Sequence, residues 1–135
     1  MGLRESLAML KEEGHANVYS RHDRLARATR AAMQAMGMTL FAERPAESIT
    51  SVKCPAGLNG DAVYKMLRDR YNITIAGGQD HLKDTVFRVA HLGYYDDLDI
   101  ITVTAALEMA ITDLKFKVPL GAGVAAAQKV LMERA

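Results

Sequence analysis

The residue with the clearest chemical potential in this chain is an arginine set inside an apolar, β-branched run. Arg88 lies within Asp84–Asp97, a stretch whose pattern predicts a short strand, a glycine turn and the capped start of a long helix. Because side chains alternate along a strand, Arg88 shares one face with Val86 and Ala90. The other face carries Phe87, Val89 and His91. A cation among apolar neighbours is costly unless an anion meets it, so the pattern predicts an anionic partner for Arg88.

Two kinds of anion would satisfy this guanidinium. One is the carboxylate of a structural Asp or Glu. The other is the carboxylate of a ligand, which the planar guanidinium of Arg88 would hold through two hydrogen bonds. Structural ion pairs are commoner than binding sites, so spacing alone favours the structural pair.

The composition indicates one ordinary domain without a strong electrostatic preference. The chain has 135 residues, of which 17 are basic and 16 acidic, so its charge gives no reason to expect nucleic acid or an anionic membrane as a partner. The single cysteine, Cys54, rules out an internal disulfide, and the histidines show no close metal-ligand spacing. There is no leader pattern and no apolar run approaching ~20 residues, so we expect a cytoplasmic protein that does not enter a membrane.

Hydrophobic periodicity and turn residues predict a series of short elements. In chain order these are helices over 3–14 and 16–36, strands over 39–42 and 49–54, a helix over 59–72, strands over 73–75 and 86–91, and helices over 96–115 and 121–134. Asn59 and Asp96 are expected to cap the helices that they begin. The strands are too short, and too seldom separated by helices, for a doubly wound parallel sheet. We therefore expect residues 1–135 to form a single α+β domain, with a small, mainly antiparallel sheet and helices packed on one face.

Several short motifs occur in order along nearly the whole chain. They are Gly2-Leu3-Arg4-Glu5, the helix with Arg21-His22 and Leu25 that ends at Met36-Gly37, Cys54-Pro55-Ala56-Gly57-Leu58-Asn59-Gly60, Ile75-Ala76-Gly77-Gly78-Gln79, Phe87-Arg88-Val89-Ala90-His91-Leu92-Gly93-Tyr94, and Leu120-Gly121-Ala122-Gly123-Val124-Ala125-Ala126-Ala127. Taken together, they make the chain resemble the C-terminal small domain of class V, fold-type-I pyridoxal-phosphate aminotransferases, the serine–pyruvate and alanine–glyoxylate group. Their shared order is far more specific than any one of them.

The resemblance implies roles for three residues. In that family the arginine at the position of Arg88 holds the α-carboxylate of the amino-acid substrate, which reverses the preference for a structural ion pair. Gly77 and Gly78 would lie near the mouth of the active site, although a plain tight turn explains two glycines equally well. No catalytic residue is expected within this chain. His91 and Cys54 are expected to be structural, the first through packing and a hydrogen bond, the second as a buried strand-end residue without thiol chemistry.

The resemblance also implies what other parts of the enzyme would supply. The family's Schiff-base lysine, the aspartate beside the pyridine nitrogen and the phosphate-binding groups belong to a larger, N-terminal domain that none of the 135 residues resembles. We therefore expect pyridoxal phosphate in the complete enzyme, no cofactor bound by this chain alone, and no transamination by it alone. The complete enzyme would act on an amino acid such as alanine or serine and a 2-oxo acid such as glyoxylate or pyruvate, as a homodimer.

Other readings remain open at this point. The chain could be an excised domain, a natural split or truncated gene product that pairs with a separate large-domain chain, or a stand-alone module that binds small carboxylates. The apolar face of the first helix (Leu3, Leu7 and Leu10) would favour self-association if nothing covers it. Some relatives in this family carry the label of a soluble hydrogenase subunit, but one cysteine and scattered histidines do not supply the ligands of a metal cluster.

Overall fold

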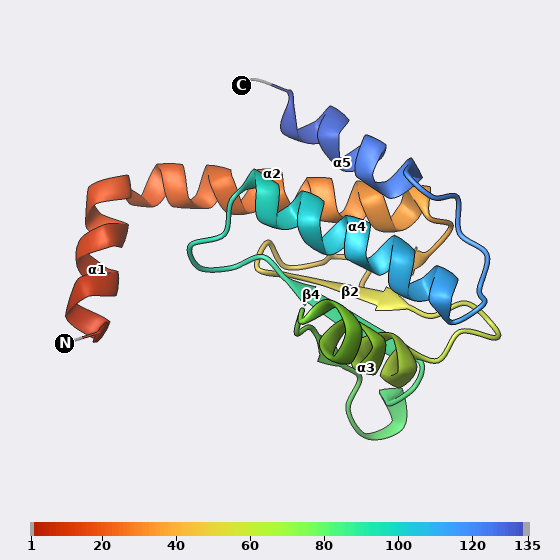
Figure 1. Cartoon of the computed structure of the whole chain (residues 1–135). Helices are drawn as coiled ribbons and strands as arrows, with labels where there is room; N and C mark the ends of the chain where they lie inside the picture. The colour runs from red at the N-terminus through yellow and green to blue at the C-terminus, as the bar shows by residue number, and fades with distance from the viewer. Residues whose placement is uncertain (1, 134–135) are drawn as a thin grey trace.

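The computed structural model describes residues 2–133 and places one small sheet beneath a group of helices (Figure 1). In chain order the elements are α1 (Gly2–Glu13), α2 (His15–Ala35), β1 (Thr39–Leu40), β2 (Ile49–Lys53), α3 (Gly60–Tyr71), β3 (Ala76–Gly77), a 3₁₀ turn (Asp80–Leu82), β4 (Val86–Ala90), α4 (Asp97–Asp113) and α5 (Ala122–Leu131). The sheet has four strands in the order β1-β2-β4-β3, and every neighbouring pair is antiparallel. The α+β prediction is confirmed.

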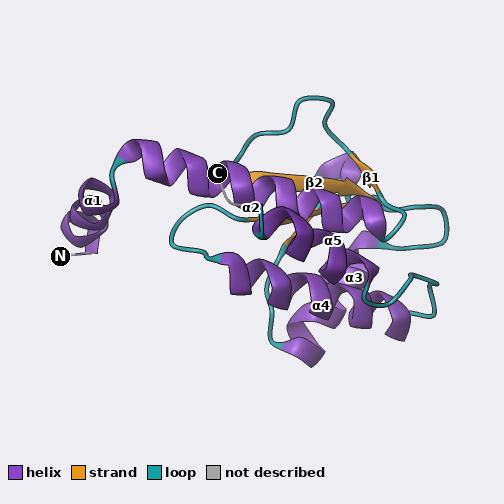
Figure 2. Cartoon of the chain, turned by 90° about the horizontal axis from the view of Figure 1, so that it is seen from above, coloured by secondary structure: helices purple, strands orange, loops and turns teal. Residues whose placement is uncertain are grey.

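The two faces of the sheet differ sharply in burial. On one face, Val52 pairs with Phe87 and Thr50 with Val89, and all four side chains are buried against the helices. The opposite face carries Ser51, half-buried, which pairs with Arg88. Helices α2, α4 and α5 pack against one another over the buried face, as Figures 1 and 2 show together. Helices α2, α4 and α5 therefore lie on one face, as predicted, and Arg88 lies on the other.

Helix capping follows the sequence closely. The side chain of Asn59 accepts a hydrogen bond from the backbone N–H of Ala62 at 2.9 Å and begins α3. Asp96 accepts from Leu98 and Asp99, while the Asp99 carboxylate accepts from the Asp96 N–H, so α4 begins with the predicted capping box. Both caps fix the residue at which the preceding loop ends and the helix begins.

The start of α5 is held by a buried carboxylate that the sequence reading missed. Glu108 lies in α4 with 3% of its surface exposed. Its two oxygens accept hydrogen bonds from the backbone N–H groups of Gly121 at 2.8 Å and Gly123 at 2.7 Å. A helix N-terminus presents unpaired N–H groups and a partial positive charge, so a carboxylate from a neighbouring helix can replace the usual side-chain cap.

Helix α1 projects away from the rest of the chain (Figure 1). None of its residues is buried, and Leu3, Leu7 and Leu10 expose 75%, 56% and 37% of their surfaces. The break between α1 and α2 falls at Gly14, whose φ of 81° suits glycine best. The exposed apolar face predicted for this helix is therefore present, while self-association through it remains a prediction.

Two local predictions were wrong. Ile73–Ile75 does not form the predicted strand, because pairing with β4 begins only at Ala76 and ends at Gly77. The spacing of Val63 and Leu67 also predicts an inward-facing Arg70 in α3, yet the Arg70 side chain is exposed and pairs with Asp113 at 3.1 Å. The predicted strand begins three residues too early, and the buried side of α3 ends at Leu67, so both errors fall at the ends of elements, where boundaries are hardest to place.

Candidate functional site

The candidate site is centred on Arg88, which lies in the middle of β4 on the open face of the sheet. Across the strands its direct neighbours are Ser51 in β2 and Ala76 in β3. Ala90, two residues further along β4, shares that face. Val86, two residues back along β4, shares that face as well and is buried, while the neighbours on the other three sides of Arg88 are small and leave its side chain room to extend over the sheet.

The guanidinium is oriented by a backbone carbonyl. Arg88 Nε donates a hydrogen bond to the carbonyl oxygen of Gly77 at 3.0 Å. The Gly78 N–H donates to the Val86 carbonyl at 2.8 Å, and Ala76 pairs with Arg88, so the backbone groups of Ala76 and Gly78 face β4. Backbone groups alternate in direction along a strand, which turns the Gly77 carbonyl toward the free edge of the sheet. The Arg88 side chain therefore crosses β3 and reaches this edge.

The other two nitrogens of the guanidinium have no partner in the part of the chain that the structure describes. Within residues 2–133, Arg88 forms no ion pair, and neither of its Nη atoms makes a hydrogen bond. Both are accessible to solvent, since neither is among the buried polar atoms without a partner. The structural ion pair that spacing alone favours is therefore not found within this range, and a bidentate donor pair remains for an external anion.

The two predicted glycines play different parts in this geometry. Gly77 supplies the carbonyl that accepts from Arg88, and a Cβ atom at this position would meet nothing within 4 Å. Gly78 packs against the turn that follows, because a Cβ atom there would lie 2.0 Å from the carbonyl oxygen of Leu82. The structure thus brings Arg88 and Gly77 into contact and packs the next residue, Gly78, against the backbone of Leu82.

A mainly apolar groove of about 420 Å³ lies next to this strand pair. It opens where Ile73–Ile75 leaves β4, between that segment and the first turns of α4. Ala76 and Ala90, the neighbours of Arg88 on the open face, contribute to its lining, together with Val89 and Ile100. The failure of residues 73–75 to pair as a strand is what creates this groove.

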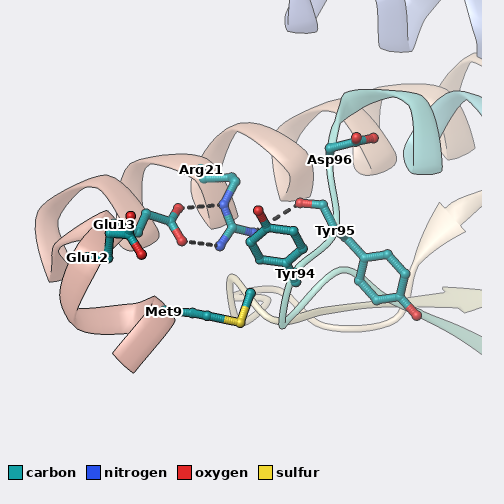
Figure 3. A pocket seen from close by; sticks show the side chains of 7 residues that line it. All are labelled: Met9, Glu12, Glu13, Arg21, Tyr94, Tyr95 and Asp96. Atoms are coloured by element: carbon teal, nitrogen blue, oxygen red, sulfur yellow. Dashed lines mark hydrogen bonds and ion pairs between the residues drawn. The ribbon is translucent and has the colours of Figure 1, made fainter. Parts of the chain in front are cut away.

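A second hollow, of about 500 Å³, lies where α1 meets the loop before α4 (Figure 3). Its lining includes Arg21, which donates to both carboxylate oxygens of Glu13 and to the carbonyls of Gly93 and Tyr95. The hydrogen bonds from Arg21 hold the pKa of Glu13 below its ordinary value. Because these contacts use both ends of the guanidinium fork, Arg21 is committed to holding α1 in place.

His91 has the buried surroundings and the hydrogen bond that were predicted for it, whereas Cys54 is half-buried and not fully buried as predicted. His91 is fully buried, and its Nε2 lies 2.9 Å from Thr50 Oγ1. Burial, with a smaller contribution from the positive charge of Arg30, lowers the pKa of His91 to about 4. Burial raises the pKa of the Cys54 thiol to about 11, so the reactive thiolate is scarce at neutral pH.

Every lysine of the chain is exposed. Among residues 2–133, no group of three or more His, Cys, Asp or Glu side chains is arranged to hold a metal ion. None of the helices in the described range has both the length and the apolar character needed to span a membrane.

The chain is similar in sequence to several known proteins. It is 38% identical to the serine–glyoxylate aminotransferase of Methylorubrum extorquens over 98% of its own length. It is also 42% identical, over 96% of its length, to a soluble hydrogenase 42 kDa subunit of Anabaena cylindrica, so the expected hydrogenase label does occur among its relatives. Each comparison covers only 34% of the relative. No protein-family model matches the chain.

Solved structures show the same relationship. The ureidoglycine–glyoxylate aminotransferase of Bacillus subtilis superposes with a TM-score of 0.90 and 29% sequence identity, over 95% of this chain and 34% of that one. The pyridoxamine–pyruvate aminotransferase of Mesorhizobium loti gives a TM-score of 0.86 at 28% identity. The chain thus spans about a third of the proteins that it matches, and its sequence and fold match the C-terminal small domain of class V pyridoxal-phosphate-dependent aminotransferases.

Proposed function

We propose that this chain is the domain that binds the substrate carboxylate in a pyridoxal-phosphate-dependent aminotransferase. The enzyme would use glyoxylate or pyruvate as the amino acceptor. The observation that carries the proposal is the state of Arg88, whose Nε is fixed by Gly77 while both Nη atoms are free of partners within residues 2–133. Two parallel N–H donors match the two oxygens of a carboxylate. Serine–glyoxylate and ureidoglycine–glyoxylate aminotransferases among the similar proteins support the substrate class.

The proposed contribution of the chain is orientation. Binding an α-carboxylate through two hydrogen bonds fixes the plane of that group and hence the direction of the bonds at the neighbouring carbon. The cofactor, which supplies the electron sink for amino transfer, would come with the part of the relatives that this chain does not match. The isolated chain is accordingly expected to be inactive.

The experiment that tests the proposal joins the chain to the part it lacks. In the Methylorubrum extorquens serine–glyoxylate aminotransferase, the matching third is replaced by residues 2–133 of this chain, and transamination is measured with serine and glyoxylate. Arg88→Lys keeps the charge but removes the fork, so it is expected to raise the KM for both substrates by about tenfold or more. Arg88→Gln is expected to have a larger effect.

Two controls make the result interpretable. Arg27→Gln removes an exposed arginine with surface ion pairs and should leave both KM values unchanged. The visible absorbance of the bound cofactor reports whether each hybrid is loaded. A loaded Arg88→Lys hybrid with unchanged KM values would refute the role proposed for Arg88.

The stand-alone carboxylate-binding module is kept as a second candidate, because the Nη atoms of Arg88 are accessible without any partner chain. Calorimetry of the isolated chain with alanine, serine and glyoxylate separates the two. Millimolar or tighter binding that Arg88→Gln abolishes, together with an inactive hybrid, would favour the module. Negligible binding by the isolated chain and an active hybrid would favour the aminotransferase.

The absence of cofactor binding by the isolated chain is a separate prediction. Because every lysine is exposed, incubation with pyridoxal phosphate followed by borohydride should label several lysines partially and at random. Peptide mass spectrometry measures the distribution. Stoichiometric labelling of a single lysine would show a cofactor site within these residues and would contradict the prediction.

A further inference from the structure

The support behind Arg88 is a backbone contact between β3 and the turn that follows it. Gly78 ends the pairing with β4, and the chain then folds back through the 3₁₀ turn Asp80–Leu82. A Cβ atom on Gly78 would lie 2.0 Å from the Leu82 carbonyl oxygen and 2.5 Å from its carbon. These separations are far below any real contact, so position 78 accepts only glycine unless the backbone moves.

The Leu82 carbonyl is not free to give way. It accepts hydrogen bonds from the Thr85 N–H at 3.1 Å and from the Thr85 hydroxyl at 3.0 Å. The next turn of chain is fixed as well, because the Asp84 carbonyl accepts from the Gly60 N–H at the start of α3 at 2.7 Å. The turn is thus held by hydrogen bonds within itself and by one to the start of α3. A side chain at position 78 would therefore displace β3 and not the turn.

Displacement of β3 would act directly on Arg88. Gly78 is joined by one peptide bond to Gly77, whose carbonyl accepts from Arg88 Nε at 3.0 Å. A hydrogen bond weakens steeply once its distance or angle departs from these values, so a shift of about 1 Å would release the guanidinium. Without this anchor, the long arginine side chain would sample several rotamers and would lose its fixed direction.

We infer that Gly78 is a positioning residue, which through its packing on Leu82 holds the Gly77 carbonyl against Arg88 Nε and leaves the two Nη atoms for the ligand. The carboxylate is then met end-on by Nη1 and Nη2, because Nε is already occupied. The effect on substrate rests on the proposed function of Arg88, whereas the effect on the Arg88 side chain does not.

The glycine pair provides its own matched control. Gly78→Ala introduces the clash with Leu82, while Gly77→Ala adds a methyl group that meets nothing within 4 Å. In the isolated chain, nuclear magnetic resonance of arginine side chains follows the Nε–H signal of Arg88, assigned by its loss in Arg88→Lys. We expect Gly78→Ala to shift this signal and speed its exchange with water by about tenfold, and Gly77→Ala to leave both unchanged. Equal behaviour of the two variants would overturn the inference.

The turn offers a milder pair of variants in case Gly78→Ala does not fold. Thr85→Val removes the hydroxyl bond to Leu82 at an exposed position, and Thr85→Ser restores it. A partial shift of the Arg88 Nε–H signal in the first and its recovery in the second support the inference. No shift in Thr85→Val, when Gly78→Ala is also unfolded, counts against it.

The substrate effect is measured separately in the aminotransferase hybrid. Gly78→Ala is expected to raise the KM for glyoxylate and serine by about tenfold with a smaller change in kcat, because it misdirects a binding group. A disturbed Arg88 signal with unchanged KM values would refute the proposed function and leave the positioning role standing. An undisturbed signal would refute the positioning role alone.

Discussion

Replacing Glu108 with alanine is expected to lower the free energy of unfolding by about 2–3 kcal/mol, because it leaves buried N–H groups at the start of α5 without an acceptor. Glu108 is buried and accepts from the backbone N–H groups of Gly121, Gly123 and, more distantly at 3.4 Å, Val124. A carboxylate bound to N–H donors at a helix N-terminus also gains from the partial positive charge there. Its loss removes both effects at once.

Urea denaturation measures this change, and two further variants identify its cause. Glu108→Gln keeps one acceptor oxygen but loses the charge, so about half of the loss is expected. Glu12→Ala removes an exposed glutamate of α1 and should change stability by less than about 0.5 kcal/mol. If Glu108→Ala is as mild as Glu12→Ala, the carboxylate does not hold α5 in place.

Glu108 also shows what a local reading of the sequence cannot find. Asn59 and Asp96 cap the helix that follows them directly in the chain, so type and spacing were sufficient to predict both. Glu108 caps a helix that begins more than ten residues later, and on sequence alone it is a charged residue next to the apolar positions of α4. The close approach at Gly123, where a Cβ atom would lie 2.9 Å from Glu108 Oε1, is evident only from the structure.

The sheet was predictable where side-chain alternation is strong. In β4, Phe87 and Val89 are buried on one face and Arg88 is left on the other, as the period of two requires. The segment Ile73–Ile75 misled the assignment, because its two isoleucines pack against the core without pairing as a strand. Tertiary contacts determine whether a short apolar segment forms a strand, and these contacts cannot be inferred from residue spacing.

The candidate site was predictable as a set of residues and not as an arrangement. The resemblance to the aminotransferase small domain pointed to Arg88, Gly77 and Gly78, and their roles stay proposals. It could not show that Gly77 reaches Arg88 through a carbonyl, or that Gly78 meets the backbone of Leu82. Both contacts involve main-chain atoms, whose direction depends on strand register.

The second large effect expected is a pH dependence of stability that originates at His91. The side chain is fully buried with its Nε2 beside Thr50 Oγ1, and burial lowers its pKa from 6.5 to about 4. Between these two values the unfolded chain binds a proton at this histidine while the folded chain does not. Stability due to His91 is therefore complete above pH 6.5 and is lost as the pH falls, by about 3 kcal/mol on reaching pH 4.

A substitution that keeps the hydrogen bond but cannot titrate isolates this contribution. His91→Gln can still bond to Thr50, so its unfolding free energy should fall much less between pH 7 and pH 4 than that of the unchanged chain. Carboxylates that titrate in this range are common to both proteins, and their effect cancels in the difference. His81→Gln, at an exposed position, should keep the full pH dependence. Urea denaturation at several pH values makes the comparison, and equal slopes for His91→Gln and the unchanged chain would place the pH dependence elsewhere. The expected divergence would assign this acid sensitivity to the buried contact between Thr50 in β2 and His91, which directly follows β4.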